Sequence, residues 1–279
     1  LSSAASDVYK RQVKKSEKIK KSPLPFTTST LQQEAAKTLN MSTKRTMNIA
    51  QQLYEGVDIK GRGTVGLITY LRTDSTRVAD EAKVASKDYI SENYGEKYLP
   101  QSSNAKKDDK KIQDAHEAIR PTDLSLSPAL VKESLQRDQF RLYQLIWKRF
   151  VASQMAPAQY ETTSVRIGAG EYIFTVSASK IVFDGFMSVY KTDDDNEETN
   201  TLAKGLDENS VLTLDDVNGT QHFTQPPAHF TEASLVKALE EQGIGRPSTY
   251  APTISTIIAR HYIAKEPVSY THLRAHETK

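Results

Sequence analysis

The chain has 279 residues and a net charge of +2, and hydrophobic side chains make up 37% of it. This length is enough for two or three domains with sizeable cores. The absence of cysteine excludes disulfides, thiol catalysis and cysteine-ligated zinc within the chain. No apolar run approaches the roughly 18 residues of a membrane span, and the first residues lack the apolar core of a secretory signal. These features fit a cytoplasmic protein without a membrane partner.

The charges are distributed unevenly along the chain. Residues 1–60 carry 11 Lys and Arg against 5 Asp and Glu, whereas residues 151–230 carry 4 against 12. A basic region can bind a polyanion by neutralising phosphates and releasing counterions, although many surface lysines are simply solvated. The acidic segment is unsuited to binding duplex phosphates.

Both ends of the chain differ from the sequence beside them. Residues 1–12 and 267–279 resemble translated sequencing-adaptor sequence, so we predict that they are non-native tails. This interpretation implies that the reading frame was cut at both ends. The lysine-rich residues 14–21 are expected to be flexible.

Two short helices are predicted next. Ser29 is expected to cap a helix over residues 30–39, with Gln32 completing a capping box. Ser42 is expected to cap a second helix that ends before Gly56. Apolar residues at helical spacing give the second helix a core stripe: Met47, Ala50, Leu53 and Tyr54. Two helices followed by a strand predict a helix-turn-helix or winged-helix-like unit, which is also a common packing unit.

Residues 65–70 form a β-rich run that ends in Tyr70, and Arg72 follows two residues later. Residues two apart in an extended segment point to the same side, so both side chains can reach one target. A nearby cation favours the phenolate of tyrosine and can also bind a phosphate. This pair suits attack on a phosphodiester, although tyrosines at strand ends are more often core residues. The hydroxyls and carboxylate that follow can fix the arginine and bind backbone groups: Thr73, Asp74, Ser75 and Thr76.

The middle of the chain predicts a helix over residues 80–93 and a mobile lysine-rich loop over residues 101–113. His116, Glu117 and Arg120 then lie within five residues. A zinc-protease motif is excluded because no second histidine follows at helical spacing. A lone histidine is more often a hydrogen-bonding residue than a catalytic one. A strongly amphipathic helix is predicted over residues 138–154, and we interpret its aromatic residues as core.

From Tyr160 the pattern changes to the period of two that is typical of strands. Strands are predicted over residues 162–167, 172–178, 181–190 and 211–217, with an exposed acidic loop over residues 193–201. We assign no chemistry to this antiparallel region.

The last informative stretch contains two predicted helices. Thr231 is expected to cap the first, over residues 232–242, and a Gly-Arg-Pro-Ser-Thr turn begins the second. Helix N-termini can bind phosphates through unpaired N–H groups and the helix dipole. Arg246, Ser248 and Thr249 add donors there, although an ordinary capped helix start has the same spacing.

Four segments, in the same order along the chain, resemble sequence motifs of bacterial type IA DNA topoisomerases: residues 25–33, 68–76, 114–122 and 244–250. The family commonly has methionine in place of Leu71, a volume-conserving change. The resemblance extends over residues 23–266. It implies an α+β fold with a winged-helix-like catalytic-tyrosine domain (residues 23–157), a β-rich arch segment (158–225) and a helical single-strand DNA-binding segment (226–266).

The resemblance also implies a reaction. A tyrosine attacks a single-strand phosphodiester, forms a 5′-phosphotyrosine link, and is released when the free 3′-hydroxyl reverses the attack. No ATP is needed, and the complete enzyme relaxes negatively supercoiled DNA as a monomer. The implied catalytic residues are Tyr70, Arg72 and His116. The implied DNA contacts are Thr73, Asp74, Ser75 and Arg120, together with a more distant strand-binding site at Arg246, Ser248 and Thr249.

The chain departs from the family pattern in what it lacks. We find no Toprim domain, whose acidic residues hold Mg²⁺ in the complete enzyme, and no C-terminal zinc modules. We therefore expect no metal bound by this chain and no DNA relaxation by it alone. The alternatives are a topoisomerase III or reverse-gyrase relative, a non-catalytic single-strand DNA-binding module, and a tyrosine phosphodiesterase that does not reseal its product.

Overall fold

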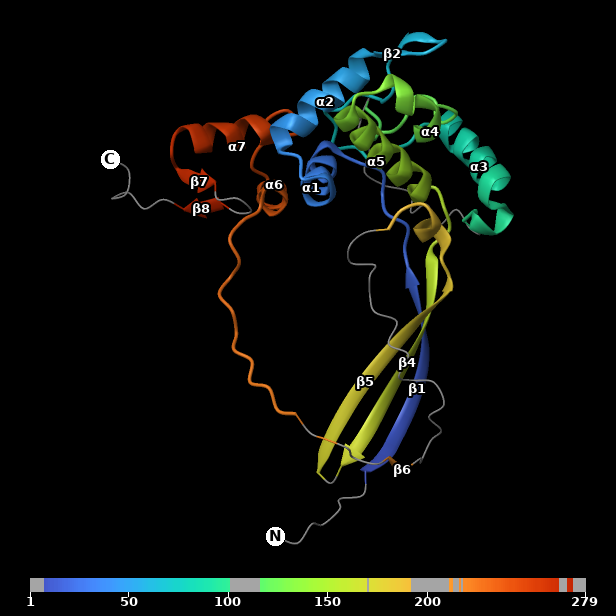
Figure 1. The fold of residues 1–279 in the computed structure, drawn as a ribbon, viewed down its shortest axis with the longest axis vertical. Helices are drawn as coiled ribbons and strands as arrows, with labels where there is room; N and C mark the ends of the chain where they lie inside the picture. The colour runs from blue at the N-terminus through green and yellow to red at the C-terminus, as the bar shows by residue number, and fades with distance from the viewer. Residues whose placement is uncertain are drawn as a thin grey trace. The chain divides into compact units, whose positions relative to one another are not determined.

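The computed structural model describes residues 8–100, 116–169, 171–191, 211–212, 216, 218–265 and 270–272. The chain divides into two compact units, each built from two stretches that are distant in sequence. The strand unit comprises Leu1–Ser22 and Ala156–Gln225, and the helical unit comprises Pro23–Met155 and Pro226–Lys279 (Figure 1). The predicted α+β class is confirmed. No helix among the described residues has the length and apolar character needed to span a membrane.

The strand unit is built on one antiparallel sheet with the strand order β5-β4-β1-β6. Its elements are β1 (Val8–Lys20), β4 (Ala158–Ala169), β5 (Tyr172–Phe183), the 3₁₀ turn η3 (Gly185–Ser188) and β6 (Val211–Leu212). β1 pairs with β4 from Val8↔Ala169 to Lys20↔Ala158. The sheet carries polar cross-strand contacts, such as Thr162 with Ser179 at 3.0 Å between hydroxyl oxygens.

The structure corrects two predictions for this unit. Residues 14–21 were expected to be flexible, yet they lie almost wholly in the strand Val8–Lys20, which also includes the end of the predicted non-native tail; the origin of that tail stays a prediction. The exposed lysines obscured this strand, because a lysine-rich strand can pair through its backbone while its side chains stay in water. The strand predicted over residues 181–190 is also wrong, since β5 ends at Phe183 and η3 follows. The acidic loop 193–201 and most of the strand predicted over 211–217 lie outside the described residues.

The helical unit contains the remaining elements. In its first stretch these are α1 (Thr28–Leu39), α2 (Thr43–Glu55), β2 (Val57–Ile59), β3 (Gly63–Val65), α3 (Asp80–Tyr94), η1 (Glu96–Tyr98), α4 (Pro128–Val131), η2 (Lys132–Ser134) and α5 (Arg137–Ser153). In its second stretch they are α6 (Glu232–Glu241), α7 (Tyr250–Ala259), β7 (Ile263–Lys265) and β8 (Tyr270–His272). Figure 1 shows α6 and α7 beside α1 and α2. The lysine-rich loop predicted over 101–113 lies outside the described residues.

Helix α5 supplies the centre of the core, as its amphipathic pattern predicted. Its apolar and aromatic residues are buried: Leu142, Tyr143, Leu145, Ile146, Trp147 and Phe150. The Tyr143 hydroxyl donates to the Leu126 carbonyl at 2.6 Å, and burial raises the pKa of this phenol strongly. The interpretation of these aromatic residues as core is therefore confirmed.

Of the two N-cap residues predicted for α1 and α2, one is confirmed and one is wrong. Ser42 caps α2 by accepting a hydrogen bond from the Arg45 N–H, as predicted. Thr27 caps α1 in place of Ser29, and Thr30 completes its capping box. The Ser29 hydroxyl instead donates to Glu240 on α6 at 2.6 Å. The cap prediction failed because Thr27, Ser29 and Thr30 are all good capping types, so tertiary contact decided among them.

Candidate active site

The segment that carries Tyr70 is extended but is only partly a strand. β3 ends at Val65, and Ile68 makes a single bridge to Pro121. The regular strand predicted over residues 65–70 is therefore wrong. Two backbone contacts explain this, because the Leu67 N–H donates to the Leu53 carbonyl at 2.7 Å and Gly66 lies against Tyr54. The chain here contacts the end of α2 and pairs with residues 120–122 only through an isolated bridge, so no regular strand forms.

Burial alternates along residues 70–75. Leu71, Thr73 and Ser75 are buried, whereas Arg72 and Asp74 are exposed and Tyr70 is 37% exposed. Tyr70 and Arg72 therefore share the accessible side of the segment, as their two-residue spacing predicted. Neither side chain has a hydrogen bond or ion pair with any residue that the structure describes. Both groups are free to contact a ligand.

Helix α1 fixes the buried side of this segment. The Thr28 hydroxyl donates to the Leu71 carbonyl at 2.7 Å and accepts from the Thr73 N–H at 2.9 Å. The Thr73 hydroxyl accepts from the Ser75 N–H, and the Ser75 hydroxyl accepts from the Arg77 N–H. Thr73 and Ser75, which were predicted to contact DNA, are buried and make these hydrogen bonds within the segment; their contact with DNA stays a prediction. Asp74 is exposed and remains a candidate contact.

His116 lies directly beside Tyr70, although 46 positions separate them in the chain. The two rings stack with centroids 5.1 Å apart and an interplanar angle of 28°. Tyr54, at the end of α2, meets Tyr70 edge-on with centroids 5.7 Å apart. The resemblance implied that His116 lies near Tyr70, and the structure places it there. The contact of Tyr54 with Tyr70 was not predicted.

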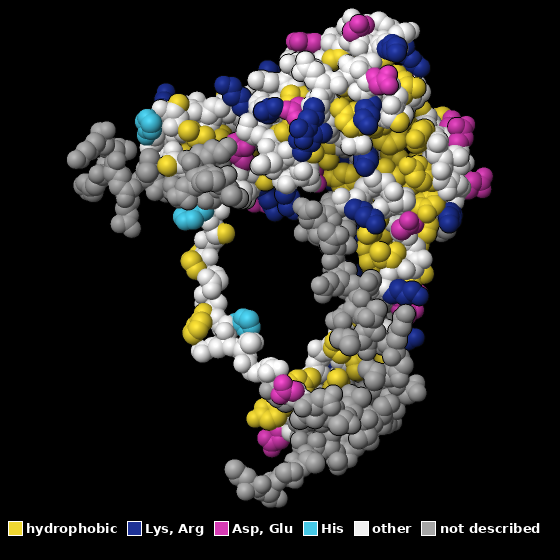
Figure 2. All heavy atoms as spheres, in the orientation of Figure 1, with side chains coloured by type: hydrophobic (Ala, Val, Ile, Leu, Met, Phe, Trp, Pro, Cys, Tyr) yellow, Lys and Arg dark blue, Asp and Glu magenta, His cyan; other side chains and the backbone are white. Residues whose placement is uncertain are grey.

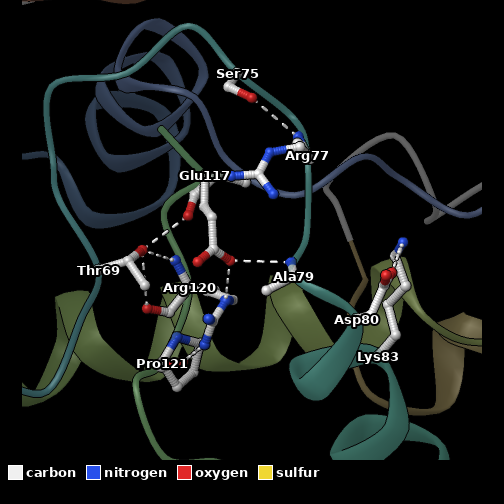
Figure 3. Close-up of polar contacts among 10 residues, drawn as sticks. Thr69, Ser75, Arg77, Ala79, Asp80, Lys83, Glu117, Arg120 and Pro121 are labelled. Atoms are coloured by element: carbon white, nitrogen blue, oxygen red, sulfur yellow. Dashed lines mark hydrogen bonds and ion pairs between the residues drawn. The ribbon is translucent and has the colours of Figure 1, made fainter. Parts of the chain in front are cut away.

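A half-buried ion pair between Glu117 and Arg120 holds the segment that carries His116 (Figure 3). The Arg120 Nε donates to Glu117 Oε2 at 2.9 Å, and the same oxygen accepts from the Ala79 N–H at 3.0 Å. Burial acts to raise the pKa of Glu117, but the hydrogen bonds from Arg120 and Ala79 outweigh it and lower this pKa below its usual value. The Thr69 hydroxyl accepts from the Arg120 N–H at 3.0 Å, which joins the pair to the segment before Tyr70.

Arg120, which was predicted to contact DNA, makes its hydrogen bonds within the fold. Its side chain is 13% exposed, and its Nη1 donates to the Pro121 carbonyl at 2.9 Å. This guanidinium is half-buried and paired, so reaching a phosphate would cost it these bonds. The bonds join Arg120 to the segment that carries His116, and its contact with DNA stays a prediction.

The Gly-Arg-Pro-Ser-Thr turn begins α7, as predicted. The Arg246 N–H donates to the Thr249 hydroxyl at 2.8 Å, so Thr249 stabilises the turn itself. Arg246 and Ser248 are exposed. We expected this turn to form a site distant from Tyr70. Instead, Ser248 and Arg72 line one pocket.

That pocket, of about 400 Å³, lies between α2 and α7 and is open to solvent. Its lining is Lys44, Met47, Asn48, Arg72, Pro247, Ser248, Ala251, Pro252, Ser255 and Thr256. Two cationic side chains and several neutral donors therefore face one space, which suits an anionic ligand such as a phosphate. Figure 2 shows Lys and Arg side chains spread over the visible face of the helical unit, with Asp and Glu side chains among them. Lys44 and Asn48 were not singled out in the sequence, because a surface lysine on a helix carries no signal by itself.

A metal site was not expected. Among the described residues no group of three or more His, Asp or Glu side chains could hold a metal ion. The described part of the chain therefore does not fit the Mg²⁺ that the family uses.

Comparisons with known proteins give the family of the chain. The family model of DNA topoisomerase matches residues 3–275, and the chain belongs to the type IA DNA topoisomerase family. A solved structure of full-length topoisomerase I from Thermotoga maritima is 41% identical to it with a TM-score of 0.81. The match covers 95% of this chain and 43% of that one, so the chain spans less than half of the relative.

Proposed function

We propose that this chain carries the strand-cleaving half of a DNA topoisomerase that breaks and rejoins single-stranded DNA. The observation that supports this most directly is the accessible Tyr70 phenol, stacked on His116 with Arg72 on the same side of its segment. The family to which the chain belongs gives the reaction class. The positions of Tyr70, Arg72 and His116 support the role that we propose for each in this reaction.

In the proposed reaction the Tyr70 hydroxyl oxygen attacks phosphorus and forms a phosphotyrosine link to the 5′ side of the break. The bond from phosphorus to the 3′-oxygen breaks, and the phenol proton is balanced by the proton that the 3′-oxygen gains. The bond energy is retained in the new ester, so the 3′-hydroxyl can reverse the attack after strand passage without ATP. Positioning and charge stabilisation at phosphorus are the protein's main contributions.

Arg72 is proposed to bind the reacting phosphate through its free guanidinium, and His116 to donate a hydrogen bond beside it. Asp74, the exposed Arg246 of the turn and the pocket residue Ser248 are proposed to contact the strand. Single-stranded regions of negatively supercoiled DNA are the proposed substrate. Mg²⁺ is proposed to act in the complete enzyme, with ligands from residues outside the described part of this chain.

A covalent-adduct assay tests this proposal. The chain is mixed with the Toprim domain of a relative, Mg²⁺ and a single-stranded oligonucleotide labelled at its 3′ end, then run on a denaturing gel. We expect a labelled protein band that is lost in Tyr70→Phe and retained in Tyr172→Phe, a tyrosine 75% exposed in β5. The chain without the added domain should bind single strands weakly and not relax plasmid DNA.

Two other results would contradict the proposal. Binding of single strands without any adduct would favour a non-catalytic binding module. Release of both free ends without an adduct or resealing would favour a phosphodiesterase.

A further inference from the structure

Tyr54 contacts the proposed nucleophile although it was expected to belong to the core stripe of α2. Leu53, the residue before it, is fully buried, whereas Tyr54 is 40% exposed. Its ring meets the Tyr70 ring at 5.7 Å between centroids and at an angle of 71°. This edge-to-face arrangement is one that aromatic pairs favour. A core role does not account for a tyrosine placed in this way.

Two backbone contacts hold Tyr54 close to Tyr70. The Leu67 N–H donates to the Leu53 carbonyl at 2.7 Å, which joins the end of α2 to the segment that leads to Tyr70. A Cβ atom at Gly66 would lie 2.7 Å from the Tyr54 carbonyl oxygen, closer than real contacts allow. Glycine at this position therefore permits the close approach that brings Tyr54 beside Tyr70.

Tyr70 depends on ring contacts for its orientation. Its hydroxyl makes no hydrogen bond with the described residues, so no polar partner selects its rotamer. A tyrosine side chain has three staggered χ1 positions, and in-line attack on phosphorus requires one of them. Tyr54 and His116 contact the Tyr70 ring from α2 and from the segment before Arg120.

We propose that Tyr54 is a positioning residue for Tyr70: its ring restricts the Tyr70 phenol to the χ1 rotamer from which it attacks phosphorus. This inference rests on the proposed role of Tyr70 as nucleophile. The Tyr54 ring is required for this role, and its hydroxyl is not. DNA affinity depends on Arg72 and the pocket between α2 and α7, so Tyr54 affects cleavage and not binding.

The experiment measures the rotamer, the cleavage rate and the DNA affinity separately. The χ1 distribution of Tyr70 is obtained from three-bond couplings in selectively labelled chain, with the resonance assigned by its loss in Tyr70→Phe. The single-turnover rate of adduct formation uses the assay described above. The variants are Tyr54→Leu, which removes the ring, and Tyr54→Phe, which retains it. Tyr94→Leu is the matched control, because Tyr94 meets Tyr98 in a similar edge-on pair that excludes Tyr70.

We expect a single χ1 rotamer for Tyr70 in the wild type, in Tyr54→Phe and in Tyr94→Leu. Tyr54→Leu should populate several rotamers and form the adduct about threefold to tenfold more slowly, with oligonucleotide affinity within twofold of the wild type. Averaged rotamers in the wild type, or a wild-type rotamer and rate in Tyr54→Leu, would overturn the inference. Tyr54→Met replaces Tyr54→Leu if the latter does not fold.

These readouts separate the two proposals. If the wild type forms no adduct, the proposed function fails whatever the rotamers show. If the wild type forms an adduct that Tyr70→Phe abolishes while Tyr54→Leu reacts normally, the proposed function stands and the role of Tyr54 fails.

Discussion

The Glu117–Arg120 pair allows a quantitative test of how the site is supported. Glu117→Gln keeps the size of the side chain but removes the negative charge from the acceptor of two hydrogen bonds. The bond from the Ala79 N–H becomes a neutral one, whereas the bond from Arg120 Nε keeps its charged donor. Bonds to charged groups contribute about 1.5–3 kcal/mol and neutral ones about 0.5–1.5 kcal/mol. Because the two side chains are only 24% and 13% exposed, solvent screening is small. We expect the free energy of unfolding to fall by about 1–2 kcal/mol.

Thermal unfolding followed by circular dichroism measures this loss. A change of this size corresponds to a decrease in Tm of about 2–8 °C for a unit of 150–250 residues. Glu92→Gln is the matched control, because Glu92 is an exposed glutamate on α3 and its replacement should change stability by less than about 0.5 kcal/mol.

The pH dependence provides a second test of the same reasoning. The pKa of Glu117 in the folded chain lies below its usual value of 4.5, so the stabilisation is fully present above pH 4.5. It is lost as the pH falls through the lower, folded-state pKa, where the wild-type carboxyl becomes neutral like the glutamine. The Tm difference between wild type and variant should therefore shrink on acidification. Equal Tm values at pH 7, or a difference that grows at low pH, would refute the account.

Three further substitutions probe the fold. Tyr143→Phe leaves the buried Leu126 carbonyl without its donor at 2.6 Å and should lower the urea-unfolding free energy by about 1–3 kcal/mol. Thr27→Ala removes the side-chain cap of α1 and should cost about 1 kcal/mol, measured the same way. Gly185→Ala should cost about 2 kcal/mol or more, because φ is +48° and the added Cβ would lie 2.5 Å from the Ala156 carbonyl oxygen. An unchanged urea midpoint in any of the three would contradict the corresponding contact.

Much of the helical unit could be predicted because its signals are local. The apolar stripe of α5, the Ser42 cap and the Gly56 stop of α2 each lie within a few residues of the element they define. The shared side of Tyr70 and Arg72 followed from the period of an extended chain. The proximity of His116 followed from family resemblance, because no local pattern brings it across 46 positions.

The features that were missed depend on distant contacts. Burial of Thr73 depends on Thr28, which lies 45 positions earlier and whose hydroxyl donates to the Thr73 carbonyl. The inward orientation of Arg120 depends on Glu117 and on the backbone at Ala79. No short sequence window contains Thr28 with Thr73, or Ala79 with Glu117, so the sequence does not show that these groups contact one another within the fold.

The alternation along residues 70–75 divides six neighbouring positions into two mutational classes. Changes at the inward positions Leu71, Thr73 and Ser75 should reduce the amount of folded chain, since each side chain fits a closed space or a backbone partner. The side chains of Tyr70 and Arg72 are exposed, so their substitution should leave the expression level and the Tm unaffected while abolishing adduct formation. Saturation libraries would be scored in parallel for protein abundance and for adduct yield. The property that is lost should then alternate from one position to the next, between abundance at inward positions and adduct yield at outward ones.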